Sequence, residues 1–206
     1  MGAVVTCRHQ AQVRCGNVIL VSKIETEIKL KVDDASAAAA RIEATGARLL
    51  YSRELEDNQL YDFPDHRLME RGAMLRVRTL ERQTLLTYKD RARLEGGVKS
   101  RREVESALPS TEAEPLTAIL RSIGLEPLFR YQKYRTTWED GSLLITLDET
   151  PIGAFIELEG GKPLIDQMAS RLGFRTEDYL SNSYRDLYVH FLTDRQGPLD
   201  RMLFTK

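Results

Sequence analysis

The sequence contains little cysteine and little histidine. Cys7 and Cys15 are its two cysteines, and the three histidines are scattered at positions 9, 66 and 190. Two cysteines near one end of the chain do not make a disulfide framework, and neither residue type is spaced like the ligands of a zinc site. We therefore expect a reducing, cytoplasmic setting.

Long apolar runs and an excess of one charge are also missing. No stretch approaches the roughly 20 consecutive apolar residues of a transmembrane helix, and residues 1–16 lack the apolar core of a secretory signal. The 30 basic and 31 acidic residues leave a net charge of −1, which provides no overall basic field for nucleic acid or an anionic membrane. We expect neither as a partner, so any strong charge effect must arise within a local, concave site.

The composition that is present suits one folded domain. The chain has 206 residues, of which 42% are hydrophobic and 30% charged, enough to build a core without the signature of disorder. It shows no internal repeat and no clear linker. We expect a poorly ordered leader over residues 1–17, a single α+β domain over 18–193, and a polar C-terminal tail over 194–206 that frays.

Turn residues and apolar periodicity divide this domain into strands and helices. Residues 91–98, which include Gly96 and Gly97, are expected to form a flexible connection. The expected strands cover 18–32, 48–63, 73–80, 84–90, 99–108, 128–138, 143–149 and 154–159, and the expected helices cover 35–45, 112–122, 163–172 and 183–192.

The first strand has one charged face and one apolar face. Side chains alternate between the two faces of a strand, which places Glu25, Glu27, Lys29 and Lys31 on one side and Thr26, Ile28, Leu30 and Val32 on the other. An isolated edge strand with a solvated face would show the same pattern. What favours another interpretation is that the pattern recurs on most of the later strands.

The shared pattern predicts a closed eight-stranded antiparallel β-barrel with helices packed outside. An open sheet could expose its charged face to water, but a barrel must turn one face into its lumen. Because the helices need an apolar surface to cover, the charged faces should point inward. The expected lumen contains Lys29, Lys31, Arg76, Arg78, Lys89, Arg101, Lys133 and Arg135, together with Glu25, Glu27, Glu103, Glu105, Asp148, Glu157 and Glu159.

Such a lumen has a distinctive chemistry. Crowded carboxylates repel one another and are stabilised by a bound cation, and hard oxygen ligands suit Mg²⁺ or Mn²⁺. Crowded basic groups repel one another and are stabilised by a bound polyanion, and arginine binds phosphate through two parallel hydrogen bonds. A metal-bound polyphosphate would satisfy both sets at once. The alternative is an internal salt-bridge network without a ligand, which would stabilise the fold only weakly.

The motif Glu25-x-Glu27-x-Lys29 resembles the ExExK signature of the CYTH superfamily, the triphosphate tunnel metalloenzymes. These include class IV adenylyl cyclase, thiamine triphosphatase, inorganic triphosphatases and RNA triphosphatases. The resemblance spans about residues 22–192 and continues through Leu75-Arg76-Val77-Arg78, Thr87-Tyr88-Lys89, Arg101-x-Glu103-x-Glu105, Lys133-x-Arg135, Asp148, Phe155-Ile156-Glu157-Leu158-Glu159 and Ser183-Tyr184-Arg185-Asp186-Leu187.

The resemblance implies an eight-stranded tunnel that binds a triphosphate along its axis with Mg²⁺ or Mn²⁺. We expect a monomer or a homodimer. The metal ligands implied are Glu25, Glu27, Glu157 and Glu159, while Asp148 and Glu105 either hold a metal or orient the basic groups. The phosphate-binding residues implied are Lys29, Arg76, Arg78, Lys89, Arg101, Lys133 and Arg135, of which Lys29, Arg76, Arg78, Lys133 and Arg135 are the catalytic candidates.

Three functions stay open at this point. A triphosphatase would hydrolyse inorganic, thiamine or nucleoside triphosphate. A class IV adenylate cyclase would convert ATP to cyclic AMP and pyrophosphate, but the His-Phe pair that precedes ExExK in some of these cyclases is absent here, which favours the triphosphatase. A polyphosphate- or nucleotide-binding module without turnover would need the same charges. We expect the aromatic residues Tyr61, Phe63 and Trp138 to serve ordinary packing rather than base recognition.

Overall fold

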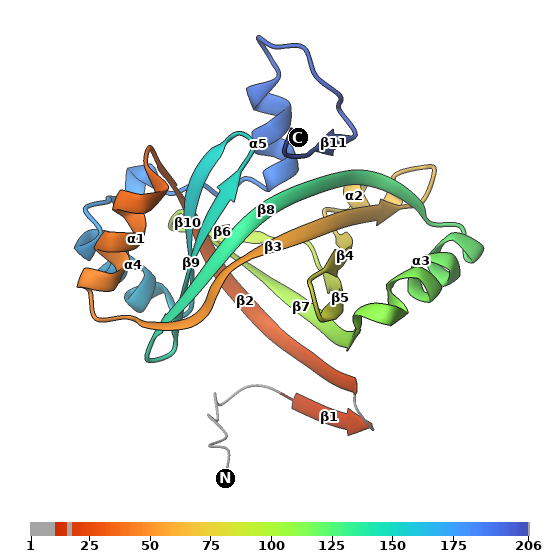
Figure 1. The fold of residues 1–206 in the computed structure, drawn as a ribbon, viewed down its shortest axis with the longest axis horizontal. Coiled ribbons are helices and arrows are strands. Elements are labelled where there is room, and N and C mark those ends of the chain that lie inside the picture. The colour runs from red at the N-terminus through yellow and green to blue at the C-terminus, as the bar shows by residue number, and fades with distance from the viewer. Residues whose placement is uncertain (1–10, 16–17, 206) are drawn as a thin grey trace.

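The structure is a computed structural model, and it describes residues 11–15 and 18–205. The chain forms an α+β fold in which a ring of long strands is flanked by helices (Figure 1). Within the described residues, no helix is long and apolar enough to cross a membrane.

The elements follow the order expected from the sequence, with additions. The strands are β1 (Ala11–Cys15), β2 (Val18–Val32), β3 (Arg48–Asp62), β4 (Met74–Thr79), β5 (Gln83–Lys89), β6 (Arg93–Glu95), β7 (Val98–Pro109), β8 (Glu126–Asp140), β9 (Leu143–Thr150), β10 (Gly153–Glu159) and β11 (Arg201–Met202). The helices are α1 (Ala35–Ala44), α2 (Arg67–Glu70), α3 (Ala113–Ser122), α4 (Lys162–Arg171) and α5 (Tyr184–Phe191).

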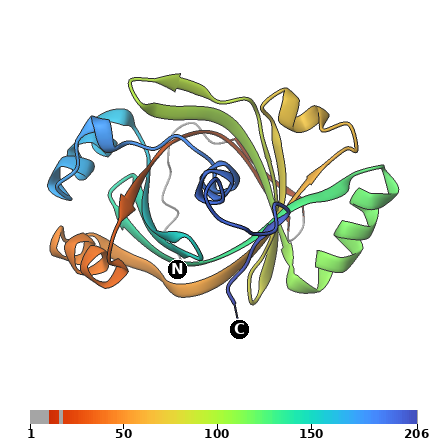
Figure 2. The same ribbon diagram turned by 90° about the horizontal axis from the view of Figure 1, so that it is seen from above.

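Eight of the strands form a ring. Neighbouring strands pair in the order β2, β10, β9, β8, β3, β4, β5 and β7, and pairing between β7 and β2 returns to the start. Every pairing around this ring is antiparallel. Figure 2 shows the strands arranged as a ring, with α1, α3 and α4 outside it. The predicted arrangement of eight antiparallel strands with helices outside is confirmed as this ring.

The alternation of side chains along β2 explains which face points inward. Ile28 and Leu30 are fully buried on the outer face, where Ile42 of α1 and Met168 of α4 cover them. The Asp34 carboxylate begins α1 by accepting a hydrogen bond from the Ala37 amide at 2.8 Å. The helices thus bury the apolar side of the sheet, and the charged side is left to face the interior of the ring.

Three segments differ from the sequence-based expectation. Residues 11–15 of the expected leader form β1, which pairs with β2, whereas residues 1–10 and 16–17 lie outside the described part. The expected flexible connection over 91–98 contains β6, because Gly96 and Gly97 adopt positive φ angles and allow a tight hairpin with β7. The tail does not fray throughout, since β11 pairs in parallel with β8 and Met202 is buried.

Helix α5 has a different position from the other helices. In Figure 2 it lies over the middle of the ring, and in Figure 1 it stands at one end of it. The chain is fastened on both sides of this helix. Leu180 exchanges two backbone hydrogen bonds with Lys29 of β2, at 3.0 and 2.9 Å, and β11 pairs with β8. This helix therefore closes one end of the ring instead of covering its outer wall.

Candidate active site

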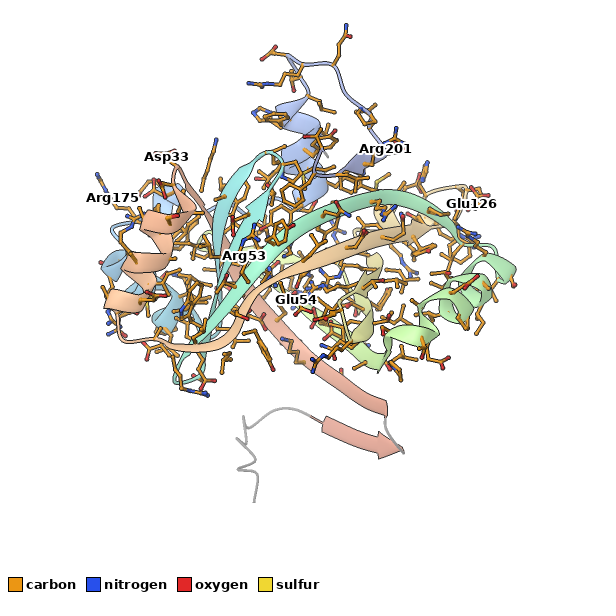
Figure 3. The ribbon with its side chains drawn as sticks, in the orientation of Figure 1. Asp33, Arg53, Glu54, Glu126, Arg175 and Arg201 are labelled. Atoms are coloured by element: carbon orange, nitrogen blue, oxygen red, sulfur yellow. The ribbon has the colours of Figure 1, made fainter. Side chains whose placement is uncertain are left out.

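The ring encloses a cavity of about 400 Å³ that is lined mainly by charged side chains. Figure 3 shows side chains crowding the interior, whereas the labelled Asp33, Glu126, Arg175 and Arg201 lie at the periphery. The cavity lining includes all of the predicted phosphate-binding residues, namely Lys29, Arg76, Arg78, Lys89, Arg101, Lys133 and Arg135. It also includes the predicted acidic residues Glu25, Glu27, Glu105, Glu157 and Glu159.

One wall of the cavity pairs residues of β2, β5 and β7. The Lys89 ammonium lies 2.5 Å from a carboxylate oxygen of Glu25 and 2.5 Å from one of Glu103. Arg101 donates hydrogen bonds to Glu25 at 3.2 Å and to Glu27 at 3.3 Å. Candidate phosphate-binding cations are therefore held by candidate metal-binding carboxylates.

A second group lies where β2 meets β10. Strand register places Lys29 opposite Glu157 and Glu27 opposite Glu159. The Lys29 ammonium is 3.0 Å from Glu157, which also accepts a hydrogen bond from Arg135. Each carboxylate of this group is thus matched by a cation from a neighbouring strand.

Asp148 on β9 is the most enclosed acidic residue of the site, with none of its surface exposed. Its carboxylate accepts hydrogen bonds from Lys133 at 2.7 Å and from two nitrogens of Arg135 at 2.6 Å each. A fourth bond comes from the Tyr184 hydroxyl at 2.6 Å. Four donors on one carboxylate fix the two basic side chains of β8, which fits the orienting role for Asp148 better than metal binding.

Glu56 on β3 was missed by the sequence analysis. It is buried and lies 3.0 Å from Arg78, 3.4 Å from Lys133 and 3.9 Å from Arg135. The Asn58 side chain, two residues along, accepts a hydrogen bond from Arg78 at 3.1 Å. Their equal parity on the expected strand over 48–63 was the available signal.

Lys23 and Lys99 were also missed, although both line the cavity. Lys23 forms an ion pair with Glu159, and the Lys99 ammonium is 3.4 Å from Glu27. Burial lowers the pKa of Lys99 to about 8 against the opposing effect of Glu27. Lys99 lies two residues before Arg101 on β7 and therefore points to the same face. Extending the alternation of Arg101, Glu103 and Glu105 two residues toward the N-terminus would have identified it.

Other expectations about individual residues can be compared directly. Lys31 does not face the cavity and is exposed, because β2 has passed the end of the cavity at that point. Trp138 is buried in the apolar cluster under α1 and α4, as the packing prediction requires. Phe63 lies under the Arg67 guanidinium at 3.8 Å. Tyr61 packs in a cluster with Leu68, although it also borders the cavity.

The pKa values of the cavity carboxylates reflect their cation partners. Burial by itself would raise the pKa of Glu157, but Lys29, Arg135 and Lys133 hold it well below its ordinary value. Burial is likewise outweighed at Glu27, whose pKa Lys29 and Lys89 lower. Glu159 differs, because burial raises its pKa, Lys23 opposes the rise and the Glu25 carboxylate adds to it.

The carboxylates on β2 and β10 suit a divalent cation in their chemistry. Glu25, Glu27, Glu157 and Glu159 provide hard oxygen donors that face one cavity. Burial raises the pKa of Glu159, Lys23 opposes the rise, and the Glu25 carboxylate adds to it. Within the residues that the structure describes, no three acidic, histidine or cysteine side chains are gathered as a ready ligand set. Before these four glutamates could bind a metal, the basic side chains that now pair with them would have to move toward another anion.

Two polar atoms in the cavity lining have no hydrogen-bond partner within the described part of the chain. These are Nε of Arg76 and the hydroxyl oxygen of Thr146, both buried. Buried polar atoms in folded proteins are usually paired. The cavity therefore offers unused hydrogen-bonding capacity next to its cations.

Comparisons with known proteins agree with this geometry. The model of the CYTH domain family matches residues 23–170. A curated relative is the adenylate cyclase CyaB of Aeromonas hydrophila, which is 24% identical over 182 residues, covering 83% of this chain and 92% of the relative.

Two solved structures share the fold. A Vibrio parahaemolyticus protein that carries the name adenylate cyclase superposes with a TM-score of 0.66 at 20% identity, covering 81% of this chain and 98% of the other. A Hippeastrum protein, for which a dominant triphosphatase activity is described, superposes with a TM-score of 0.61 at 20% identity, covering 85% and 99%.

Proposed function

Because the chain belongs to the CYTH domain family, we propose that it is a divalent-metal-dependent enzyme that processes a triphosphate inside the ring, and that its reaction is triphosphate hydrolysis. The observation that carries this proposal is the convergence of basic residues from β2, β4, β5, β7 and β8 on one enclosed cavity. A chain of phosphates is the small anion that could engage so many cations at once.

The structure suggests how the cavity would exchange partners on binding. In the described state the basic groups are paired with carboxylates, as in Lys89 with Glu25 and Lys29 with Glu157. A triphosphate would draw these cations to its oxygens and so release the carboxylates. Glu25, Glu27, Glu157 and Glu159 would then hold Mg²⁺ or Mn²⁺, which when bound can neutralise phosphate charge and activate water.

The remaining catalytic work is positioning and charge neutralisation by the protein's own side chains. In phosphoryl transfer the protein has little covalent chemistry to perform. Arg76 and Arg78 come from β4 and Lys133 and Arg135 from β8, the two strands that flank β3. They can therefore hold the phosphates from one side of the cavity while Lys29 holds them from the other. Fixed cations stabilise the charge that develops on the phosphate oxygens without reorganising during the reaction.

A cyclase is the second candidate, favoured by two observations. The relative from Aeromonas hydrophila, similar over almost all of its length, is named an adenylate cyclase. The cavity also has apolar residues on one side, Leu60, Met74 and Leu128, which could contact a base. Against it, those residues pack in the cluster that contains Tyr184 of α5, which gives them a structural role. Hydrolysis is preferred because most of the residues that line the cavity are charged.

Product analysis distinguishes the candidates. Purified protein would be incubated with Mg²⁺ or Mn²⁺ and separately with inorganic triphosphate, thiamine triphosphate and ATP. Phosphate release supports the triphosphatase, and cyclic AMP with pyrophosphate from ATP would replace it with the cyclase. Binding without turnover at enzyme concentrations near those of substrate would identify a binding module. We include in this proposal a cytoplasmic location and a monomeric or homodimeric state.

A further inference from the structure

Tyr184 begins α5 and reaches from the closed end of the ring into the cavity. It lines the cavity and is buried. Its ring contacts Tyr131 of β8 and Phe155 of β10, with centroids 5.8 and 5.7 Å away. The residue therefore has an ordinary packing role through its ring, which a phenylalanine would also fill.

The hydroxyl of Tyr184 has a role that packing does not explain. It donates a 2.6 Å hydrogen bond to Oδ2 of Asp148, the same oxygen that Lys133 and Arg135 bind. The ring also lies beneath two ammonium groups, those of Lys29 at 5.3 Å and Lys133 at 5.0 Å from the centroid. Cations at this distance are attracted to the face of an aromatic ring. One side chain thus contacts three residues of the site on three strands.

The surrounding structure fixes Tyr184 firmly. Ser183 and Asp186 form reciprocal capping bonds at the start of α5, between side chain and backbone in both directions. Three residues before the cap, Leu180 pairs with the backbone of Lys29. The first turn of α5 is therefore tied to the strand that carries a candidate phosphate-binding lysine.

We infer that Tyr184 is a positioning residue for the phosphate-binding cations of the cavity. Its hydroxyl holds Asp148 so that Asp148 aligns Lys133 and Arg135, and its ring holds the ammonium groups of Lys29 and Lys133. This inference rests on the proposed function, in which those cations bind the triphosphate. Helix α5 is accordingly part of the site as well as a closure for the ring.

The test compares Tyr184→Phe with the matched control Tyr188→Phe. Tyr188 lies one turn further along the same helix and packs its ring against Phe129 and Phe191, at 5.8 and 6.5 Å between centroids. Affinity would be measured by calorimetry with inorganic triphosphate in EDTA, where metal-dependent turnover does not interfere. We expect Tyr184→Phe to bind about tenfold more weakly, the size of one lost hydrogen bond to a charged group. Because loss of this buried bond also lowers the free energy of unfolding, binding would be measured at a temperature at which circular dichroism shows the variant to be folded. Tyr188→Phe should bind like the wild type.

A double-mutant cycle identifies the route of the effect. In an Asp148→Asn background, Tyr184→Phe should not weaken triphosphate binding any further. If Asp148→Asn does not fold, Lys133→Met serves as the background instead. There, Tyr184→Phe should weaken binding less than it does in the wild type. An undiminished effect in either background would overturn the inference.

Arg76→Gln separates this inference from the proposed function, because Arg76 bonds to Tyr131 and Thr87 rather than to Asp148. If Arg76→Gln weakens binding while Tyr184→Phe does not, the inference on Tyr184 fails and the proposed function stands. If Arg76→Gln binds triphosphate like the wild type, the proposed function fails.

Discussion

The ammonium nitrogen of Lys89 lies 2.5 and 2.6 Å from the two carboxylate oxygens of Glu25. Both side chains are buried, and each is assigned to a different task, Lys89 to phosphate and Glu25 to metal. Since a carboxylate bound to an ammonium group is a poor metal ligand, this pair links the two binding events.

Lys89→Met should therefore change metal and triphosphate binding in opposite directions. The substitution keeps the length of the side chain but removes its charge, so Glu25 loses one competing cation and Mn²⁺ alone should bind several-fold more tightly. Inorganic triphosphate should bind more weakly, because the variant lacks one of the cations assigned to phosphate. Calorimetry with each ligand separately measures both effects. Unchanged or weaker Mn²⁺ binding would contradict the competition between Lys89 and the metal.

Glu27→Gln should weaken Mn²⁺ binding strongly, because it removes one charged oxygen donor from a set of few hard ligands. The matched control is Glu149→Gln, which removes a glutamate on the outer face of β9, where Arg53 binds it at 2.7 Å. Calorimetric titration with Mn²⁺ should show loss of affinity in the first variant and none in the second. Equal affinities in Glu27→Gln and the wild type would exclude Glu27 as a ligand.

The ring and most of its lining could be predicted because the two faces of each strand differ so clearly. Glu25, Glu27 and Lys29 alternate with residues that α1 and α4 cover, and Arg76 with Arg78 repeats the pattern on β4. Side-chain parity does not depend on the partner strand. The sequence therefore shows which residues face inward even when the pairing of strands is unknown.

The ion pairs and the position of α5 could not be predicted in the same way. Which cation meets which carboxylate depends on strand register, and the pairing of β3 with β8 is irregular between Leu49 and Tyr51 and between Tyr51 and Glu54. The contact between Tyr184 and Asp148 joins residues 36 positions apart. It follows from the placement of a helix over the end of the ring, which periodicity along one segment does not reveal.

Glu56→Gln should destabilise the fold by about 3 kcal/mol, the usual cost of removing one partner from a buried ion cluster. The substitution removes the counter-charge that Arg78 shares with Lys133 and Arg135, and leaves Lys133 and Arg135 with Asp148. Urea unfolding measures the free-energy change. Inorganic triphosphate should recover part of the loss by replacing the missing negative charge, and a variant as stable as the wild type would show that Glu56 does not balance these cations.

Acid should destabilise the protein through the cavity carboxylates. The folded-state pKa values of Glu27, Glu56 and Glu157 are below the ordinary value, so the unfolded chain binds more protons as the pH falls. Their stabilising effect is complete above about pH 5 and is lost as the pH falls below the ordinary glutamate pKa of about 4.3. The free energy of unfolding in urea should decrease below about pH 4.3, with a smaller decrease in Glu56→Gln. Glu159, whose folded-state pKa is raised, acts in the opposite direction and only above that pH. A free energy that stays level to about pH 3 would contradict this assignment.

The most direct test of the central claim compares two basic residues on the two faces of β8. Lys133 points into the cavity and contacts Asp148, whereas Arg130 is exposed and binds Asp57 at 2.7 Å. If the interior of the ring binds the triphosphate, Lys133→Gln should lower the affinity for inorganic triphosphate at least about tenfold, as expected for the loss of a charge-assisted contact, and should impair turnover with Mg²⁺ or Mn²⁺. Arg130→Gln should leave both within about twofold, the small effect usual for exposed ion pairs. Equal effects of the two substitutions, or wild-type binding by Lys133→Gln, would contradict the account.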